Sequence, residues 1–159
     1  MRIVHRTIGF LLVSLFVLPV MAEISVQTKD MDCSPTGHNW RRLAFLLTNN
    51  GSEDVNMADL AVRYDFEEVP NDFVSAVWYY SVRTIDWSQQ GGSIDEVTIS
   101  IDGYADLNVL RLNFEDRILP AQGQAEIQLG IHNDDWSMIN ENNDPSYVYS
   151  CNYVSNPGV

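Results

Sequence analysis

Short segments in which apolar and polar residues alternate recur along almost the whole chain, and they constrain its fold more than any other feature. Alternation with a period of two is typical of β-strands that bury one face, and helix-like spacing of apolar residues is almost absent. Clusters of turn-forming residues separate the segments. The predicted strands are residues 23–29, 43–48, 60–66, 77–82, 97–101, 109–114 and 125–129, and the predicted turns are 49–51, 90–92, 102–103 and 120–123. The sequence therefore predicts an all-β fold, a β-sandwich or jelly roll.

The N-terminal residues 1–22 have the pattern of a secretory signal peptide. A short basic start precedes an apolar run over residues 8–20, and the small residues in 20–22 fit a signal-peptidase site. An uncleaved anchor helix is the rival interpretation, but the run contains Pro19 and is shorter than the roughly 20 residues that span a bilayer. We therefore expect residues 23–159 to form a single secreted domain, extracellular, or periplasmic if the host has an outer membrane.

The charge of the chain excludes polyanionic partners. Nine lysine and arginine residues stand against 22 aspartate and glutamate residues, which gives a net charge of −13. Loss of Arg2 and Arg6 with the signal peptide would make this charge two units more negative. Nucleic acids require clustered Lys and Arg to neutralise their phosphates, and an anionic membrane surface would repel the protein. We expect no nucleic-acid or membrane partner, whereas a neutral polymer or a cation is compatible.

Cys33 and Cys151 are the only cysteines, and they lie near opposite ends of the predicted domain. In an exported protein, two such cysteines are most simply explained as one disulfide bond. The alternative is two separate buried thiols. A disulfide that closes so long a loop stabilises the folded state by about 4–5 kcal/mol in the chain-entropy model.

The sequence lacks the motifs of the common enzyme classes. It has no Gly-x-Ser-x-Gly elbow and no glycine-rich phosphate loop. After residue 22 the only imidazoles are His38 and His132, too few for a typical zinc site without thiolates. Adjacent carboxylates could serve a glycosidase, but chance explains such pairs among 22 acidic residues. The candidate acids are Glu67, Glu68, Asp102, Asp106, Asp134 and Asp135. We expect no catalytic activity.

The segment Asp135-Trp136-Ser137 is the most informative local motif. It follows the predicted strand 125–129 and leads into a polar loop, so the residues next to Trp136 in the sequence are mostly polar. An exposed indole can stack on the flat face of a sugar ring while neighbouring polar side chains bind the hydroxyl groups. The alternative is a half-buried structural tryptophan.

An ordered set of short motifs resembles the family 3 carbohydrate-binding modules. The set begins with the turn 47–52 and the strand 55–64, which ends in an Arg-Tyr pair. It continues in the family's order with Phe114, Leu119, Gly123, Ile127-Gln128, Asp135-Trp136-Ser137 and Asn143-Asp144. The resemblance covers nearly all of residues 23–159. It implies a nine-stranded jelly roll that binds cellulose through a flat strip of aromatic and polar residues.

The resemblance also assigns candidate binding residues. Trp136 matches the tryptophan of the family's strip, Gln128 matches a polar anchor, and Tyr80 is the nearest match to a further strip position. Asp135 stands beside the tryptophan and is the fourth candidate. Gly130 stands where the strip of the family has an arginine.

A calcium site is the one cofactor that the resemblance suggests. Many family members hold a structural calcium, and Glu67, Asn140, Asn143 and Asp144 could supply the oxygen ligands that calcium prefers. The alternative is an acidic loop without a bound ion. We expect no other cofactor.

The sequence thus predicts a secreted, non-catalytic, monomeric carbohydrate-binding module. Its expected partner is a polysaccharide, cellulose or a related β-glucan. The alternative is a structural or adhesive extracellular β-sandwich protein that kept the fold and lost the sugar-binding strip. A small glycan-active enzyme is the third hypothesis.

Overall fold

The computed structural model describes residues 23–34, 38–66, 73–84, 86, 88–104, 107–139, 144–156 and 159. The predicted signal peptide, residues 1–22, lies outside these ranges. The described chain consists of β-strands, loops and two 3-10 turns, η1 (Met57–Asp59) and η2 (Ile94–Glu96). Within the described residues, no helix has the length and apolar character needed to cross a membrane.

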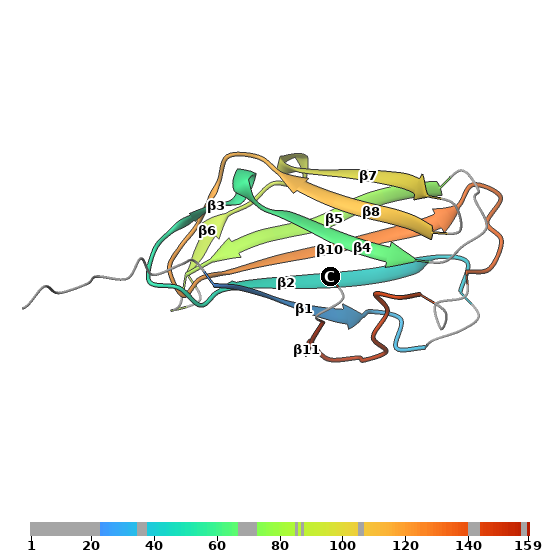
Figure 1. Ribbon diagram of the computed structural model, residues 1–159, viewed down its shortest axis with the longest axis horizontal. Helices are drawn as coiled ribbons and strands as arrows, with labels where there is room; N and C mark the ends of the chain where they lie inside the picture. Colours follow the sequence, from blue (N-terminus) through green and yellow to red (C-terminus); the bar gives the residue numbers. More distant parts are fainter. Residues whose placement is uncertain are drawn as a thin grey trace, which may run out of the picture.

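The larger of two layers is a six-stranded antiparallel sheet (Figure 1). Its strands lie in the order β11 (Val154–Ser155), β1 (Ile24–Asp30), β2 (Arg41–Asn49), β10 (Gln124–Asn133), β5 (Phe73–Arg83) and β6 (Gln89–Gly91). Neighbours in this order are mostly distant in the sequence, so the sheet joins both ends of the described chain.

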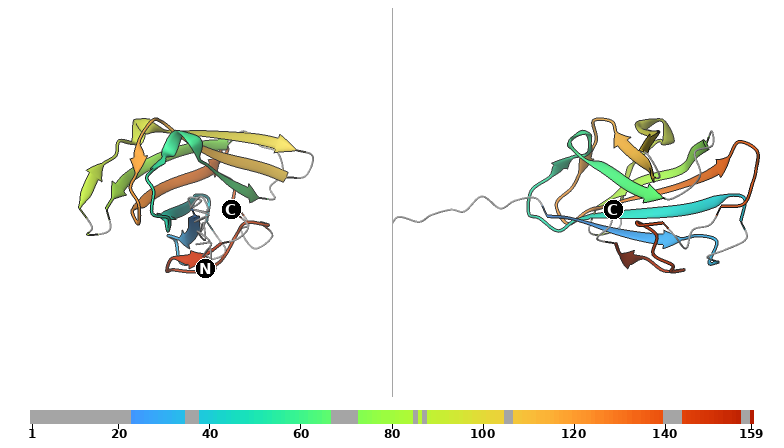
Figure 2. Two further views of the ribbon diagram at one scale, coloured as in Figure 1. Left: turned by 60° about the vertical axis from the view of Figure 1, so that its left-hand side comes forward. Right: turned by 45° about the vertical axis from the view of Figure 1, so that its right-hand side comes forward.

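The second layer is a three-stranded antiparallel sheet that lies across one face of the first (Figures 1 and 2). Its order is β4 (Ala61–Phe66), β8 (Leu107–Phe114) and β7 (Val97–Tyr104), and a short pair, β3 (Val55–Asn56) with β9 (Ile118–Leu119), closes one end. The predicted all-β sandwich is confirmed, and each predicted strand corresponds to an observed one. The structure differs from the prediction in that β7 runs through the predicted turn at 102–103 and β6 overlaps the predicted turn at 90–92. The sequence also did not indicate the two- and three-residue strands.

The core lies between the inner faces of the two sheets. Alternate residues of β2 and β10, including Phe45 and Ile127, point into it and meet Tyr64 and Leu112 of the smaller sheet. Phe45 and Tyr64 contact edge to face, with ring centroids 6.0 Å apart. Burial of each such side chain stabilises the fold by about 1.5–3 kcal/mol. The same alternation leaves the opposite face of the six-stranded sheet to polar and aromatic side chains.

A β-bulge in β5 changes which aromatic residues reach this outer face. Gln128 of β10 pairs with Tyr79, but the next residue, Leu129, pairs with Val77, so Trp78 is an extra residue in its strand. A bulge of this kind places two consecutive residues opposite one. Trp78 and Tyr79 therefore both lie on the outer side of the sheet, since Val77 belongs to the core side.

The segment 144–156 packs along β1 at the open side of the sheet. The predicted disulfide bond between Cys33 and Cys151 is confirmed, with the two Cα atoms 5.0 Å apart. The hydroxyl of Tyr147 donates to a carboxylate oxygen of Asp30 at 3.0 Å, and the backbone N–H of Asp30 donates to the carbonyl of Ser150 at 2.9 Å. These contacts hold the loop after β1 in place.

Candidate functional site

Four aromatic side chains form a continuous row on the outer face of the six-stranded sheet. Trp136 and His132 stack at 3.8 Å with an interplanar angle of 16°. Trp40 lies 5.4 Å from His132 and 5.7 Å from Trp136, and Trp78 lies 6.3 Å from Trp40. We call Trp136, His132, Trp40 and Trp78 the aromatic row. Trp136 and Trp78 are 48% and 37% exposed, so the row presents indole surface to solvent.

A tight turn after β10 positions Trp136. Its backbone N–H donates to the carbonyl of Asn133 at 2.9 Å, and its φ of +58° is unusual for a bulky residue. Asn133 donates from its side chain to the hydroxyl of Ser137 at 2.8 Å, and Asp135 accepts from the backbone N–H of Ser137 at 2.9 Å. Hydrogen bonds that the side chain and backbone of Ser137 donate to Asp135 lower the pKa of its carboxyl group. Asp135 therefore shapes the turn that exposes Trp136.

The absence of a side chain at Gly130 makes room for the row. A Cβ atom built there would lie 1.8 Å from Nε1 of Trp40 and 2.6 Å from Cζ3 of Trp78. Both indoles therefore rest directly on the backbone of β10. Glycine inside a strand often marks such a close approach, and this explains why Gly130 replaces the arginine that the resemblance would place there.

Next to the aromatic row, polar side chains of β10 lie on the same outer face of the sheet. Nε1 of Trp78 donates to Oε1 of Gln128 at 3.2 Å, and Nε2 of Gln128 donates to Glu126 at 2.9 Å. The Tyr153 hydroxyl also donates to Glu126, at 2.7 Å. Burial, followed by the hydrogen bond to Glu126, raises the pKa of Tyr153. Gln128 thus lies beside an exposed indole, as expected of a polar anchor.

Tyr80 is not on this face, and its assignment to the binding strip is corrected by the structure. Its side chain is 4% exposed and lies in the core, 6.0 Å from the ring of Phe114. Burial, and to a lesser extent the charge of Glu96, raises the pKa of Tyr80 to about 12. The outward position belongs to Tyr79, whose hydroxyl accepts a hydrogen bond from Arg83 at 2.8 Å.

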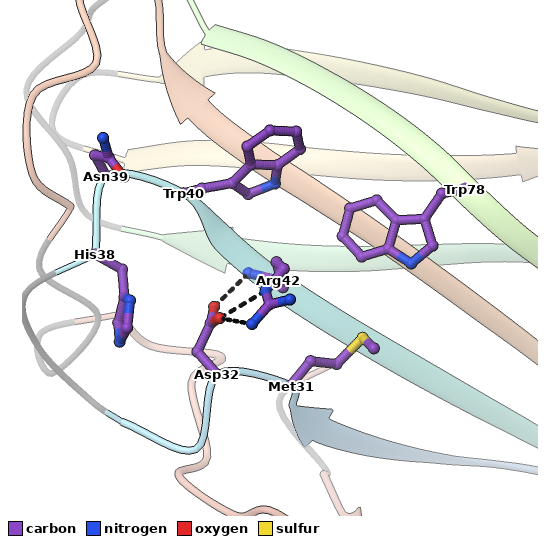
Figure 3. Close-up of a pocket in the computed structure, with 7 residues that line it drawn as sticks. All are labelled: Met31, Asp32, His38, Asn39, Trp40, Arg42 and Trp78. Carbon is purple, nitrogen blue, oxygen red and sulfur yellow. Dashed lines mark hydrogen bonds and ion pairs between the residues drawn. The ribbon is translucent and has the colours of Figure 1, made fainter.

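A cleft of about 480 Å³ adjoins the aromatic row (Figure 3). Trp40 and Trp78 form its aromatic side, and Asp32 of the loop after β1 forms an ion pair with Arg42 on the other side. The remaining lining residues are Met31, His38 and Asn39. The cleft therefore combines apolar and charged surface next to the exposed tryptophans.

The described part of the predicted calcium site does not favour a cation. Glu67, Asn140 and Asn143 lie outside the described residues. The carboxylate of Asp144 is buried and contacts the guanidinium of Arg41 at 2.5 Å. A guanidinium already supplies the positive charge that calcium would bring there. Among the described residues no three His, Cys, Asp or Glu side chains gather as a metal site.

Of the residues proposed from the sequence, Trp136 and Gln128 lie on the outer face and Asp135 shapes the turn before Trp136. Trp40, Trp78 and His132 were not among the proposed binding residues. The place of Trp40 just before a strand, two residues from Arg42, could have indicated that both side chains share one face. Trp78 stood inside a predicted strand, but only the bulge decides its face. His132 was considered only as a zinc ligand.

Comparison with known proteins gives concordant matches. The model of the family described as "Cellulose binding domain" matches residues 25–159. Endoglucanase A of Paenibacillus lautus is 30% identical over 81% of this chain, which spans 18% of that protein. An uncharacterized protein in the celA 5' region of P. lautus is 34% identical over 65% of this chain and 70% of its own length.

A solved structure with a similar fold is the CBM3a-L domain with flanking linkers from scaffoldin cipA of the Clostridium thermocellum cellulosome. The TM-score is 0.79 at 21% identity, and the match covers 88% of this chain and 85% of that one. This likeness confirms the predicted jelly-roll β-sandwich.

Proposed function

The chain belongs to the cellulose binding domain family, as the resemblance to family 3 carbohydrate-binding modules predicted, and from this premise we propose that it is a non-catalytic protein that binds a polysaccharide. The ligand is cellulose or a related β-glucan, and the binding surface is the aromatic row with its polar neighbours. The observation that carries this proposal is the exposed pair Trp136 and Trp78 on an otherwise polar sheet face.

The physical basis is the match between this surface and a glucan chain. A β-linked glucose unit has flat faces made of C–H groups and a rim of hydroxyl groups. Exposed indoles provide flat apolar surface for those faces. Gln128 and Tyr79 lie on the same face of the sheet, within reach of hydroxyl groups. A soluble protein that exposes such an aromatic patch commonly uses it for binding.

The charge and the relatives fit an extracellular role. A protein with a net charge of −13 is not attracted to polyanions, whereas an uncharged glucan experiences no such repulsion. The similarity to part of an endoglucanase supports action beside glucan-degrading enzymes outside the cell. We expect the secreted protein to be a monomer, with the disulfide bond formed after export.

Trp136→Ala tests the proposal. We expect binding to amorphous cellulose to fall at least about tenfold, because stacking surface is lost. The free energy of unfolding should change by only about 1 kcal/mol, since Trp136 is half exposed and its loss opens no cavity. Depletion assays with amorphous cellulose, microcrystalline cellulose and chitin, together with urea unfolding, measure both quantities.

Arg63→Ala is the matched control. Arg63 is exposed on β4 of the other sheet and pairs with Asp65. This variant should bind as the wild type does. Failure of the wild type to bind any glycan would favour the structural or adhesive alternative. Release of soluble sugar from the glucans would favour the hypothesis of a glycan-active enzyme.

A further inference from the structure

We infer that the cleft beside the aromatic row is a subsite for one sugar unit of a separated glycan chain, so that this protein binds single chains in preference to a crystalline surface. The inference rests on the proposed function and specifies the physical form of the ligand. It follows from the orientation of the indoles and from the charged pair in the cleft.

The three indoles of the aromatic row do not share one plane. The ring of Trp40 is inclined by 64° to that of Trp78 and by 59° to that of Trp136. A rigid, flat crystal face cannot stack on Trp40 and on either of the other two indoles at the same time. A separated chain can, because rotation about its glycosidic bonds lets successive sugar units face different directions.

The cleft has the size and surface of a small-molecule subsite. Its volume of about 480 Å³ lies within the range of small-ligand pockets, and such sites combine apolar walls with a few placed polar groups. Trp40, Trp78 and Met31 provide apolar surface, and Asp32, Arg42 and Asn39 provide hydrogen-bonding groups (Figure 3). A flat strip for a crystal surface would not need a hollow at its edge.

The ion pair in the cleft leaves N–H groups of Arg42 available to hydroxyl groups. Asp32 accepts from Nε of Arg42 at 2.6 Å, from Nη2 at 2.5 Å and from the backbone N–H of Arg42 at 3.1 Å. The Asp32 side chain is only 5% exposed, whereas that of Arg42 is 49% exposed. A guanidinium has five N–H donors, and the two bonds from this group to Asp32 leave others that can donate to neighbouring hydroxyls. A neutral sugar can bind there without breaking the pair.

A hydrogen bond within the loop after β1 shapes the cleft. The backbone N–H of Asp32 donates to Oδ1 of Asp30 at 2.8 Å, which fixes the loop that forms one side of the cleft.

The test compares Arg42→Ala with Arg63→Ala. The two arginines are 49% and 54% exposed, and each bonds through Nε to an aspartate, but only Arg42 lines the cleft. The probes are cellohexaose by calorimetry, and amorphous and microcrystalline cellulose by depletion. We expect Arg42→Ala to bind cellohexaose and amorphous cellulose about tenfold more weakly than the wild type. Arg63→Ala should match the wild type, which should bind amorphous cellulose better than microcrystalline cellulose.

Arg42→Lys and Trp136→Ala complete the design. Lysine keeps the charge but loses the planar fork of donors, so Arg42→Lys should also bind cellohexaose more weakly, and thermal unfolding of each variant confirms that it is folded. Equal affinity of Arg42→Ala and Arg63→Ala for cellohexaose would overturn the inference, as would wild-type preference for microcrystalline cellulose. If Trp136→Ala loses binding while Arg42→Ala does not, the proposed function stands and only the subsite fails. A wild type that binds no glycan overturns both.

Discussion

Single residues decide what the outer face of the large sheet can do. At Gly130, any side chain would occupy the space of the Trp40 and Trp78 rings. The aromatic row can form only because this residue is a glycine. At Trp136, a left-handed backbone conformation turns the indole outward onto His132. Strained conformations of this kind persist where the surrounding structure holds them, and they concentrate at functional sites.

The core position of Tyr80 gives a prediction for alkaline pH. Its pKa is raised to about 12 in the folded protein, whereas an unfolded tyrosine has a pKa of about 10. The unfolded state therefore loses this proton first as the pH rises. The stabilising contribution is complete below pH 10 and is lost between about pH 10 and 12. We expect the urea midpoint of the wild type to fall across this window, and that of Tyr80→Phe to fall less steeply.

Tyr153→Phe is the comparison for this experiment. The Tyr80 hydroxyl is buried without a partner among the described residues, so its removal should be nearly neutral at pH 7. The Tyr153 hydroxyl donates to Glu126, and its removal should cost about 1 kcal/mol at pH 7. Identical pH profiles for wild type and Tyr80→Phe would show that Tyr80 does not titrate in this range.

At the scale of elements, the site depends on a bulge and on a cross-linked loop. The extra residue in β5 brings Trp78 and Tyr79 to one face, while Tyr80 stays in the core. The loop after β1 carries Asp32 and is tied by Cys33 to the C-terminal segment. The hydroxyl of Tyr149 also donates to the Cys33 carbonyl at 3.0 Å. The disulfide bond therefore supports one side of the cleft as well as the fold.

Replacement of both cysteines by serine tests this dual role. The bond closes a loop between residues 118 positions apart, so its loss should lower the free energy of unfolding by about 4–5 kcal/mol. Cellohexaose binding should also weaken under conditions where the variant remains folded, because Asp32 loses its anchored neighbour. Urea unfolding and calorimetry measure the two effects. Unchanged binding in the folded variant would mean that β1 and β2 alone hold the loop.

The whole molecule is a strongly acidic sandwich, and its net charge of −13 bears on the predicted calcium site. Any cation will screen the repulsion among so many carboxylates. A specific calcium site would require oxygen ligands that bind the ion directly, in addition to this general screening. Asp144, the described member of the predicted set, is held by Arg41, whose guanidinium also lies 5.4 Å from the ring of Phe66. The predicted calcium site would therefore have to rely on Glu67, Asn140 and Asn143 alone.

Melting temperatures in calcium and in magnesium at matched ionic strength test it. Because Asp144 is engaged by Arg41, we expect equal increases from the two ions, the result of screening alone. A larger shift with calcium would show that the predicted site exists without Asp144, since magnesium tolerates irregular oxygen sites poorly. Asp144→Asn should lower the free energy of unfolding by about 3–5 kcal/mol in either ion, because it leaves a buried guanidinium without its counter-charge.

Much of the fold was predictable because the relevant signals are local. Alternation along a strand reports which residues face the core, and turn residues report where strands end, so the sandwich and the seven main strands followed from the sequence. The cysteine pair was predictable for a different reason, since no other cysteine competes for either partner. Asp135-Trp136-Ser137 was recognisable because a tryptophan with polar sequence neighbours is a candidate for an exposed position.

The tertiary structure alone decided the composition of the site. Trp40, Trp78 and Gly130 meet only because β2, β10 and β5 are neighbours in one sheet, and strand order is not encoded in any local window. The single extra residue in β5 reverses the faces that strict alternation would give, so Trp78 and Tyr79 share the outer face. Tyr80 was assigned through the resemblance, which carries no information on this bulge. Arg41 and Asp144 are likewise brought together by long-range packing. Periodicity fixes a side chain relative to its own strand, whereas its partners depend on register and topology across strands.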